Sequence, residues 1–105
     1  DPSTTSTYNA QIYTALATSI FNGHTNIVDI LLTKTLLPID YQGSNTGNTA
    51  LMYASQWGQF SIIQYLLSSN NNNIDINKRN NNNENALNLA MKNGHRDIMF
   101  NKSSK

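Results

Sequence analysis

The chain has 105 residues, with 7 Lys and Arg against 6 Asp and Glu, no cysteine and a net charge of +1. This length predicts a single domain, and the absence of cysteine excludes disulfides and thiolate metal sites. Without a basic cluster we expect no direct contact with nucleic acid, and without a long apolar run we expect no membrane insertion. The absence of a secretion signal favours an intracellular protein, cytoplasmic or nuclear.

Asparagine is unusually abundant, with 18 copies and two runs at 70–73 and 80–83. We interpret both runs as solvated loop material. The alternative is an aggregation-prone segment. It is disfavoured because each run has only four residues and the charged Lys78 and Arg79 lie between them.

Three segments of the chain share one pattern. They open at Thr14, Thr49 and Asn85, which are 35 and 36 residues apart. Each has a glycine nine residues after its opening residue and an aliphatic pair that begins four residues after the glycine. So many shared positions indicate an internal repeat, which typically builds a solenoid.

Each unit is expected to contain two short helices. Apolar residues at helical spacing follow the opening Thr or Asn, which is a suitable N-cap, and the glycine suits a left-handed C-terminal residue. The aliphatic pairs predict a second helix with a broad buried face, as in Ile27-Val28 and Leu31-Leu32. Helices this short are marginal alone, so stacking of the units must bury their apolar faces.

These residues resemble the ankyrin-repeat family. The resemblance covers residues 13–102 and is carried by segments such as Thr49-Ala50-Leu51, Tyr53-Ala54 and Gly58. It implies an all-α ankyrin-repeat helical solenoid of stacked helix–turn–helix pairs with protruding β-turn fingers. The fingers should be long, because the connecting loops carry extra residues. These loops are Leu36–Thr46 and Asn70–Asn83.

The chain departs from the family pattern at several positions. The family's Pro is replaced by Ala15, Ala50 and Ala86, and its His by Ala17, Met52 and Asn88. We divide the domain into an N-terminal lead or cap at 1–13, repeat 1 at 14–48, repeat 2 at 49–84 and a truncated repeat 3 at 85–105. In repeat 3, Lys102 and Ser103 stand where an aliphatic pair is expected. With one damaged repeat of three, we expect a marginally stable domain.

No motif for catalysis, a cofactor or a metal is evident. His24 and His95 lie two repeats apart, too far to share an ion, and by resemblance each imidazole bonds to nearby backbone carbonyls. No two carboxylates fall at helical spacing on one face, and the segment 43–47 lacks the lysine of a phosphate-binding loop. We therefore expect no enzyme activity, no cofactor and no metal site.

Two aromatic residues indicate where a partner would bind. Tyr53 and Trp57 are four residues apart on one predicted helix, and Leu51 and Ala54 are expected to face the stack, which directs the aromatic pair to the concave side. By resemblance, this side and the finger tips bind partners. Tyr41 on the preceding finger would extend the patch. The alternative is that the two rings only occupy a groove between helices.

The sequence thus predicts a non-catalytic module that binds another protein or peptide. The predicted partner-binding residues are Tyr53, Trp57, Gln56, Tyr41, Asn22 and Lys92. The alternative is a structural ankyrin segment of a larger enzyme, transcription regulator or membrane protein that packs against its own chain. The missing initiator methionine favours a piece of a longer chain under either hypothesis.

Overall fold

The computed structural model describes residues 2–68 and 74–97, with side chains from residue 7 onward. These residues form only helices joined by loops. The helices are α1 (Pro2–Phe21), α2 (Thr25–Lys34), α3 (Ala50–Gln56), α4 (Phe60–Ser68) and α5 (Ala86–Lys92). The molecule measures 43 × 29 × 24 Å along its principal axes. Predicted elements in residues 69–73 and 98–105, including the end of repeat 3, lie outside the described residues.

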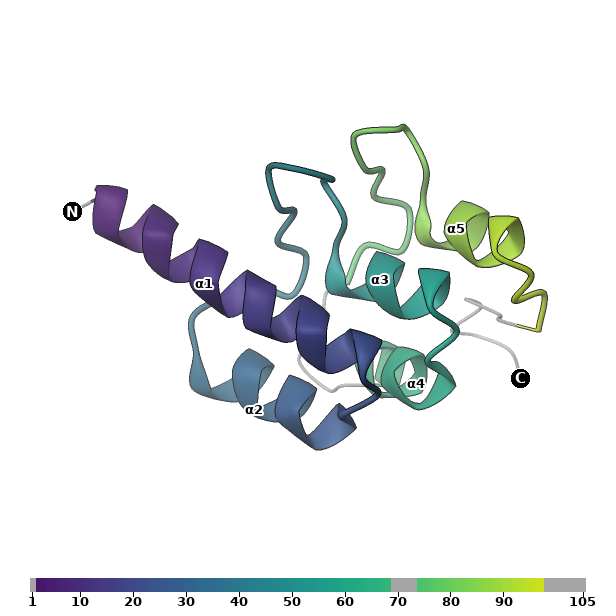
Figure 1. Cartoon of the computed structure of the whole chain (residues 1–105), viewed down its shortest axis with the longest axis horizontal. Coiled ribbons are helices and arrows are strands. Elements are labelled where there is room, and N and C mark those ends of the chain that lie inside the picture. Colours follow the sequence, from purple (N-terminus) through teal and green to yellow (C-terminus); the bar gives the residue numbers. More distant parts are fainter. Residues whose placement is uncertain (1, 69–73, 98–105) are drawn as a thin grey trace.

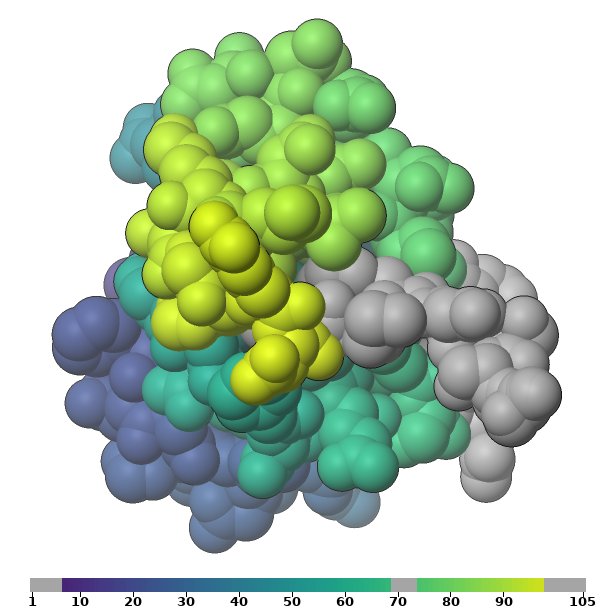
Figure 2. All heavy atoms as spheres, turned by 90° about the vertical axis from the view of Figure 1, so that its right-hand side faces the viewer, coloured from purple at the N-terminus to yellow at the C-terminus, as the bar shows by residue number. Residues whose placement is uncertain are grey.

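The helices form two layers (Figure 1). One layer holds α1, α3 and α5, with α3 packed between the other two, and α2 and α4 lie together on one side of it. On the opposite side two loops project outward, which we call the first finger (35–49) and the second finger (74–85). Figure 2 looks along the stack from the side of α5, with the second finger at the top and α1 and α2 at the bottom. Both fingers thus lie on the side of the α1, α3 and α5 layer that faces away from α2 and α4.

The predicted helix caps are confirmed in the second and third units. The side chains of Thr49 and Asn85 accept hydrogen bonds from the third residue of α3 and α5, at 3.2 and 2.8 Å. Gly23, Gly58 and Gly94 all have positive φ angles where the first helix of each unit has ended. Both signals act locally, which is why they could be predicted from the sequence.

The predicted N-cap at Thr14 is wrong. Thr14 lies inside α1, and its hydroxyl donates to the carbonyl of Ala10 at 2.9 Å, as mid-helix threonines do. Neither glycine nor proline occurs between Pro2 and Gly23, so nothing interrupts the helix before this threonine. The backbone is therefore helical across the boundary between the predicted lead at 1–13 and repeat 1. The division of the chain into a lead and a first repeat stays a prediction.

The core lies between the two helical layers and continues into the fingers. As predicted, Leu51 and Ala54 face the stack, with 1% and 0% of their surface exposed. Apolar side chains from all the described helices contribute to the same cluster, together with one residue from each finger. They are Leu16, Ile20, Val28, Leu37, Ala50, Leu51, Met52, Ala54, Ile62, Ile63, Leu66, Ile74, Ala86, Leu89 and Ala90. The fingers are thus anchored to the helices by burial.

The second asparagine run joins the two fingers. The backbone N–H of Asn81 donates to the carbonyl of Thr46 at 2.9 Å, and the Asn80 amide donates to the side-chain oxygen of Asn48 at 2.8 Å. Asn81 also bonds through its side chain to two carbonyls of the first finger. The run lies in a loop and its residues 81–83 are exposed, as interpreted, but the interpretation missed the contacts that Asn80 and Asn81 make with the first finger. The run at 70–73 lies outside the described residues.

Asp40 links the bases of the two fingers. Its Oδ2 accepts a hydrogen bond of 3.0 Å from the backbone N–H of Asp75, whereas its Oδ1 is buried and has no partner within the described part of the chain. Burial raises the pKa of the Asp40 carboxyl. The hydrogen bond from Asp75 and the positive charge of Lys78 partly oppose that rise.

Replacing Asp40 with Asn is expected to change how stability depends on pH. The folded-state pKa of Asp40 lies above the unfolded value of ~3.9. The protonated side chain therefore contributes most to the free energy of unfolding below pH ~3.9, and this contribution is lost as the pH rises through the folded-state pKa. Asp40→Asn should therefore gain stability relative to the parent from acid toward neutral pH. Urea unfolding of both proteins across this range measures the difference, in which the carboxyls that do not interact with Asp40 cancel. A difference independent of pH would contradict the prediction.

Candidate functional site

Five aromatic side chains form a continuous series, which we call the aromatic row. The rings of Tyr53 and Trp57 on α3 are stacked, with centroids 4.9 Å apart and an interplanar angle of 12°. Trp57 meets Phe21 edge-on at 5.0 Å. Tyr13 of α1 lies 5.9 Å from Tyr53 and 5.3 Å from Tyr41 of the first finger. Four of the rings are partly buried, and Phe21 is 59% exposed.

Tyr13 fixes the row to the first finger. Its hydroxyl donates to the backbone carbonyl of Asn48 at 2.6 Å and lies 3.2 Å from the Tyr53 hydroxyl. Burial, followed by the hydrogen bond with Tyr53, raises the pKa of Tyr13 well above its usual range, so this phenol stays protonated. A Cβ at Gly43 would lie 2.2 Å from the ring of Tyr13, so the backbone packs directly against it. These contacts hold the ring rigidly.

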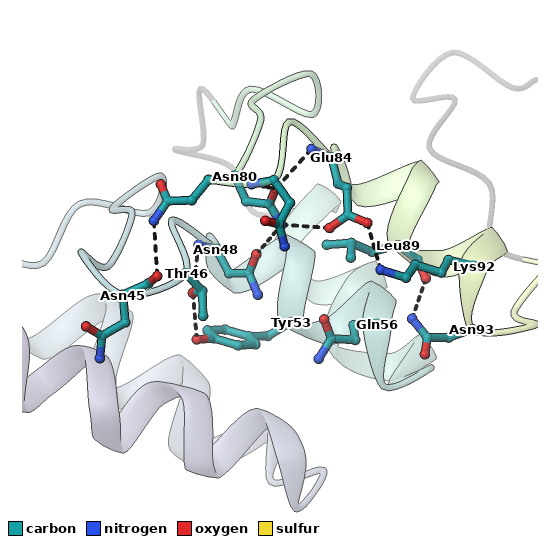
Figure 3. Close-up of a pocket in the computed structure, with 12 residues that line it drawn as sticks. Asn45, Thr46, Asn48, Tyr53, Gln56, Asn80, Glu84, Leu89, Lys92 and Asn93 are labelled. Atoms are coloured by element: carbon teal, nitrogen blue, oxygen red, sulfur yellow. Dashed lines mark hydrogen bonds and ion pairs between the residues drawn. The ribbon is translucent and has the colours of Figure 1, made fainter.

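Two adjoining pockets, each of about 330 Å³, lie between the helices and the fingers. The first lies beside α1 and is lined by Tyr13, Tyr41 and small side chains of that helix. The second lies between α3, α5 and the second finger (Figure 3). Asn45, Thr46 and Tyr53 line both, so the two pockets form one depression, which we call the groove.

The groove carries almost no net charge. Lys92 and Glu84 form an ion pair of 2.9 Å at the second pocket. The bond from Lys92, followed by one from Asn80, lowers the pKa of Glu84, so the carboxylate stays ionised and offsets the lysine. The other side chains that line the two pockets are amides, hydroxyls, tyrosines and small or apolar groups.

The structure brings four of the six predicted partner-binding residues into the groove. Tyr53, Gln56 and Lys92 line the second pocket, and Tyr41 lines the first. Trp57 lines neither pocket but continues the row from Tyr53 and is only partly buried. Their role in binding stays a prediction.

Asn22 is not brought into the groove. It lies just beyond α1, where its side chain is exposed and donates to the carbonyl of Thr18 at 2.9 Å. The backbone N–H of Asn22 donates to the same carbonyl at 3.1 Å, so both bonds hold the residue against the end of α1. Asn22 therefore lines neither pocket, and its role in binding stays a prediction.

The sequence interpretation missed Tyr13 and Phe21 as members of the aromatic row. Tyr13, Ala17 and Phe21 are spaced four residues apart and lie on one face of α1. That spacing was available in the sequence, but placing a helix start at Thr14 separated Tyr13 from the other two. The contacts of Asn48 and Asn80 had no comparable signal, because they depend on how the two fingers approach each other in space.

The histidines and carboxylates form no chemical centre in the described residues. Within residues 2–68 and 74–97 no three His, Asp or Glu side chains are placed to hold a metal ion. His24 is exposed and makes no side-chain capping bond to α2, and the ring of His95 packs against Gly58. In the same part of the chain, no helix is both long and apolar enough to cross a membrane.

A family model of ankyrin repeats, with three copies, matches residues 3–80. The chain belongs to the ankyrin-repeat family. The match and the helical architecture confirm the predicted family and fold. Ankyrin repeats are generally protein–protein interaction modules without catalytic activity. No curated protein matches the sequence.

The ankyrin match also bears on where the repeats lie. It begins at residue 3, inside the predicted lead, and ends at residue 80, before α5. The helix α5 nevertheless has the same type of N-cap as α3 and a positive-φ glycine after it. A third repeat at 85–105 therefore stays a prediction, supported by local geometry within residues 85–97.

Proposed function

We propose that this ankyrin-repeat domain binds a partner protein or peptide along the groove and the finger tips, without catalysing a reaction. The observation that carries the proposal is the aromatic row, which enters the groove at Tyr13, Tyr41 and Tyr53. Tyrosine and tryptophan dominate the binding energy of many interfaces, because they bury a large area while losing little conformational freedom.

The surroundings of the row support binding rather than packing alone. The rings of Tyr53 and Trp57 contact each other yet keep part of their surface exposed, and Tyr13 is held by hydrogen bonds. A partner would therefore meet side chains whose positions are already fixed, which reduces the entropy lost on binding. The hydroxyls and amides around the rings would supply the polar rim that interfaces require.

Peptide display offers a direct test, because no partner needs to be known. Random peptides would be selected on the protein, and each selected peptide would be measured against Trp57→Ala and Phe60→Ala by calorimetry. Phe60 is a matched control, since it is 52% exposed and lies outside the row. We expect Trp57→Ala to weaken binding about tenfold or more and Phe60→Ala to leave it unchanged. Circular dichroism would show whether each variant is folded.

The proposal fails if no selected peptide distinguishes the two folded variants.

A second candidate is a structural segment that packs against its own longer chain. It is favoured by Leu87 and Met91, which lie four residues apart on α5 and are 43% and 55% exposed. This candidate predicts that the selected peptides depend on those two side chains and are indifferent to Trp57.

A further inference from the structure

We infer that the groove, together with Trp57 and Phe21 where the aromatic row continues beyond it, takes an extended, uncharged, proline-rich segment in the polyproline II conformation. This inference rests on the proposed function and specifies its partner by chemical class. It is drawn from three features of the groove. They are the spacing of the aromatic rings, the hydrogen-bond donors beside them that have no partner among the described residues, and the near-zero net charge of the pocket lining.

The ring spacing suits a polyproline II helix. Neighbouring rings in the aromatic row are separated by 4.9–5.9 Å between centroids. A polyproline II helix rises ~3.1 Å per residue, so two of its residues span about the separation of neighbouring rings. Aromatic-lined grooves are a recurring way to bind such segments, because the ligand is already extended and loses little entropy.

The groove and the adjoining Trp57 offer donors that lack acceptors. Within the described residues, the indole N–H of Trp57, the amide of Gln56 and the hydroxyl of Tyr41 make no hydrogen bond. The side-chain amide of Asn45 has none either. None of these groups is fully buried, so water satisfies them until a ligand binds. A proline-rich segment has free backbone carbonyls and few N–H groups, so it mainly requires donors.

Other modes of peptide recognition fit less well. Addition of a β-strand needs an exposed strand edge, and the described residues contain no strand. An amphipathic helix needs an apolar groove, whereas the second pocket is lined mostly by amides (Figure 3). An acidic or basic peptide would need an unpaired opposite charge, and Lys92 already pairs with Glu84.

Trp57 makes the test direct, because it is the only tryptophan in the chain. Acetylated and amidated decaproline would be titrated into the protein while the emission of Trp57 is recorded, with an uncharged Gly-Ser decapeptide as the control ligand. We expect a saturable change with decaproline alone. The affinity should differ little between low and high salt, since the contacts involve no net charge.

Two phenylalanines provide matched variants that retain the fluorescent reporter. Phe21 belongs to the aromatic row and Phe60 does not, although both are more than half exposed and neither substitution should unfold the protein. We expect Phe21→Ala to weaken decaproline binding about threefold or more and Phe60→Ala to leave it unchanged. Equal losses in both variants would overturn the inference, as would equal binding of the Gly-Ser peptide or no saturable change.

The outcome can be separated from that of the proposed function. If displayed peptides without proline bind and depend on Trp57 while decaproline does not bind, the groove is a binding site for another class of segment. The proposed function then stands and this inference fails. If neither kind of peptide depends on the aromatic row, both fail.

Discussion

Replacing Leu51 with alanine is expected to lower the free energy of unfolding by about 2–5 kcal/mol. Leu51 lies on α3, which packs against α1, α4 and α5, and its side chain is only 1% exposed. Truncation would remove buried methyl groups and leave a cavity between helices that cannot all close around it. A domain of this size is typically stable by about 5–15 kcal/mol, so the loss would be a large part of the total.

Leu36→Ala is the matched control for Leu51→Ala. Leu36 is a leucine of the first finger that is 88% exposed, so its truncation should change stability by less than about 0.5 kcal/mol. Urea unfolding followed by circular dichroism would measure both variants against the parent. Similar losses for the two substitutions would mean that α3 is not the centre of the packed core. If Leu51→Ala lowers the free energy of unfolding only slightly, the neighbouring helices can collapse into the space that the truncation leaves.

The sequence was a good guide wherever structure depends on nearby residues. The caps at Thr49 and Asn85 and the positive φ angles of Gly58 and Gly94 were predictable, because each acts within one helical turn. The recurrence of this pattern at a fixed interval then predicted a stack, since none of the short helices could be stable alone. The same logic failed at Thr14, where a residue suited to a cap lies within an uninterrupted helix.

The candidate site was only partly predictable, because it depends on contacts between distant segments. Spacing along α3 identified Tyr53 and Trp57, but Tyr13 comes to Tyr53 from 40 residues away and its hydroxyl bonds to the carbonyl of Asn48. Asn81 likewise pairs with Thr46 across the fingers, and composition gave no sign of it. Repeat periodicity predicts that such segments are neighbours in the stack without predicting which atoms meet.

Gly47→Ala is expected to separate the two fingers and to destabilise the domain by more than the backbone strain alone. Gly47 has a φ of 75°, and a Cβ there would lie 2.8 Å from the backbone nitrogen of Asn81. That nitrogen donates to the carbonyl of Thr46, so the added methyl would displace Asn81 and break the hydrogen bond that joins the fingers there. Strain at such a backbone position costs about 1–3 kcal/mol, and the lost contacts add to it.

Gly94→Ala isolates the contribution of the contact between the fingers. Gly94 has a φ of 83°, but a Cβ there would meet no atom of the described residues within 4 Å, so its substitution should cost the backbone strain only. We expect Gly47→Ala to lower the free energy of unfolding by at least about 1 kcal/mol more than Gly94→Ala in urea titrations. Amide exchange at Asn81 should accelerate in the first variant and not in the second, because only the first disturbs its bond to Thr46. Equal losses, with Asn81 still protected, would mean that the fingers are held by their buried anchors and not by the asparagine contacts. The second finger would then keep its position beside the groove without those contacts.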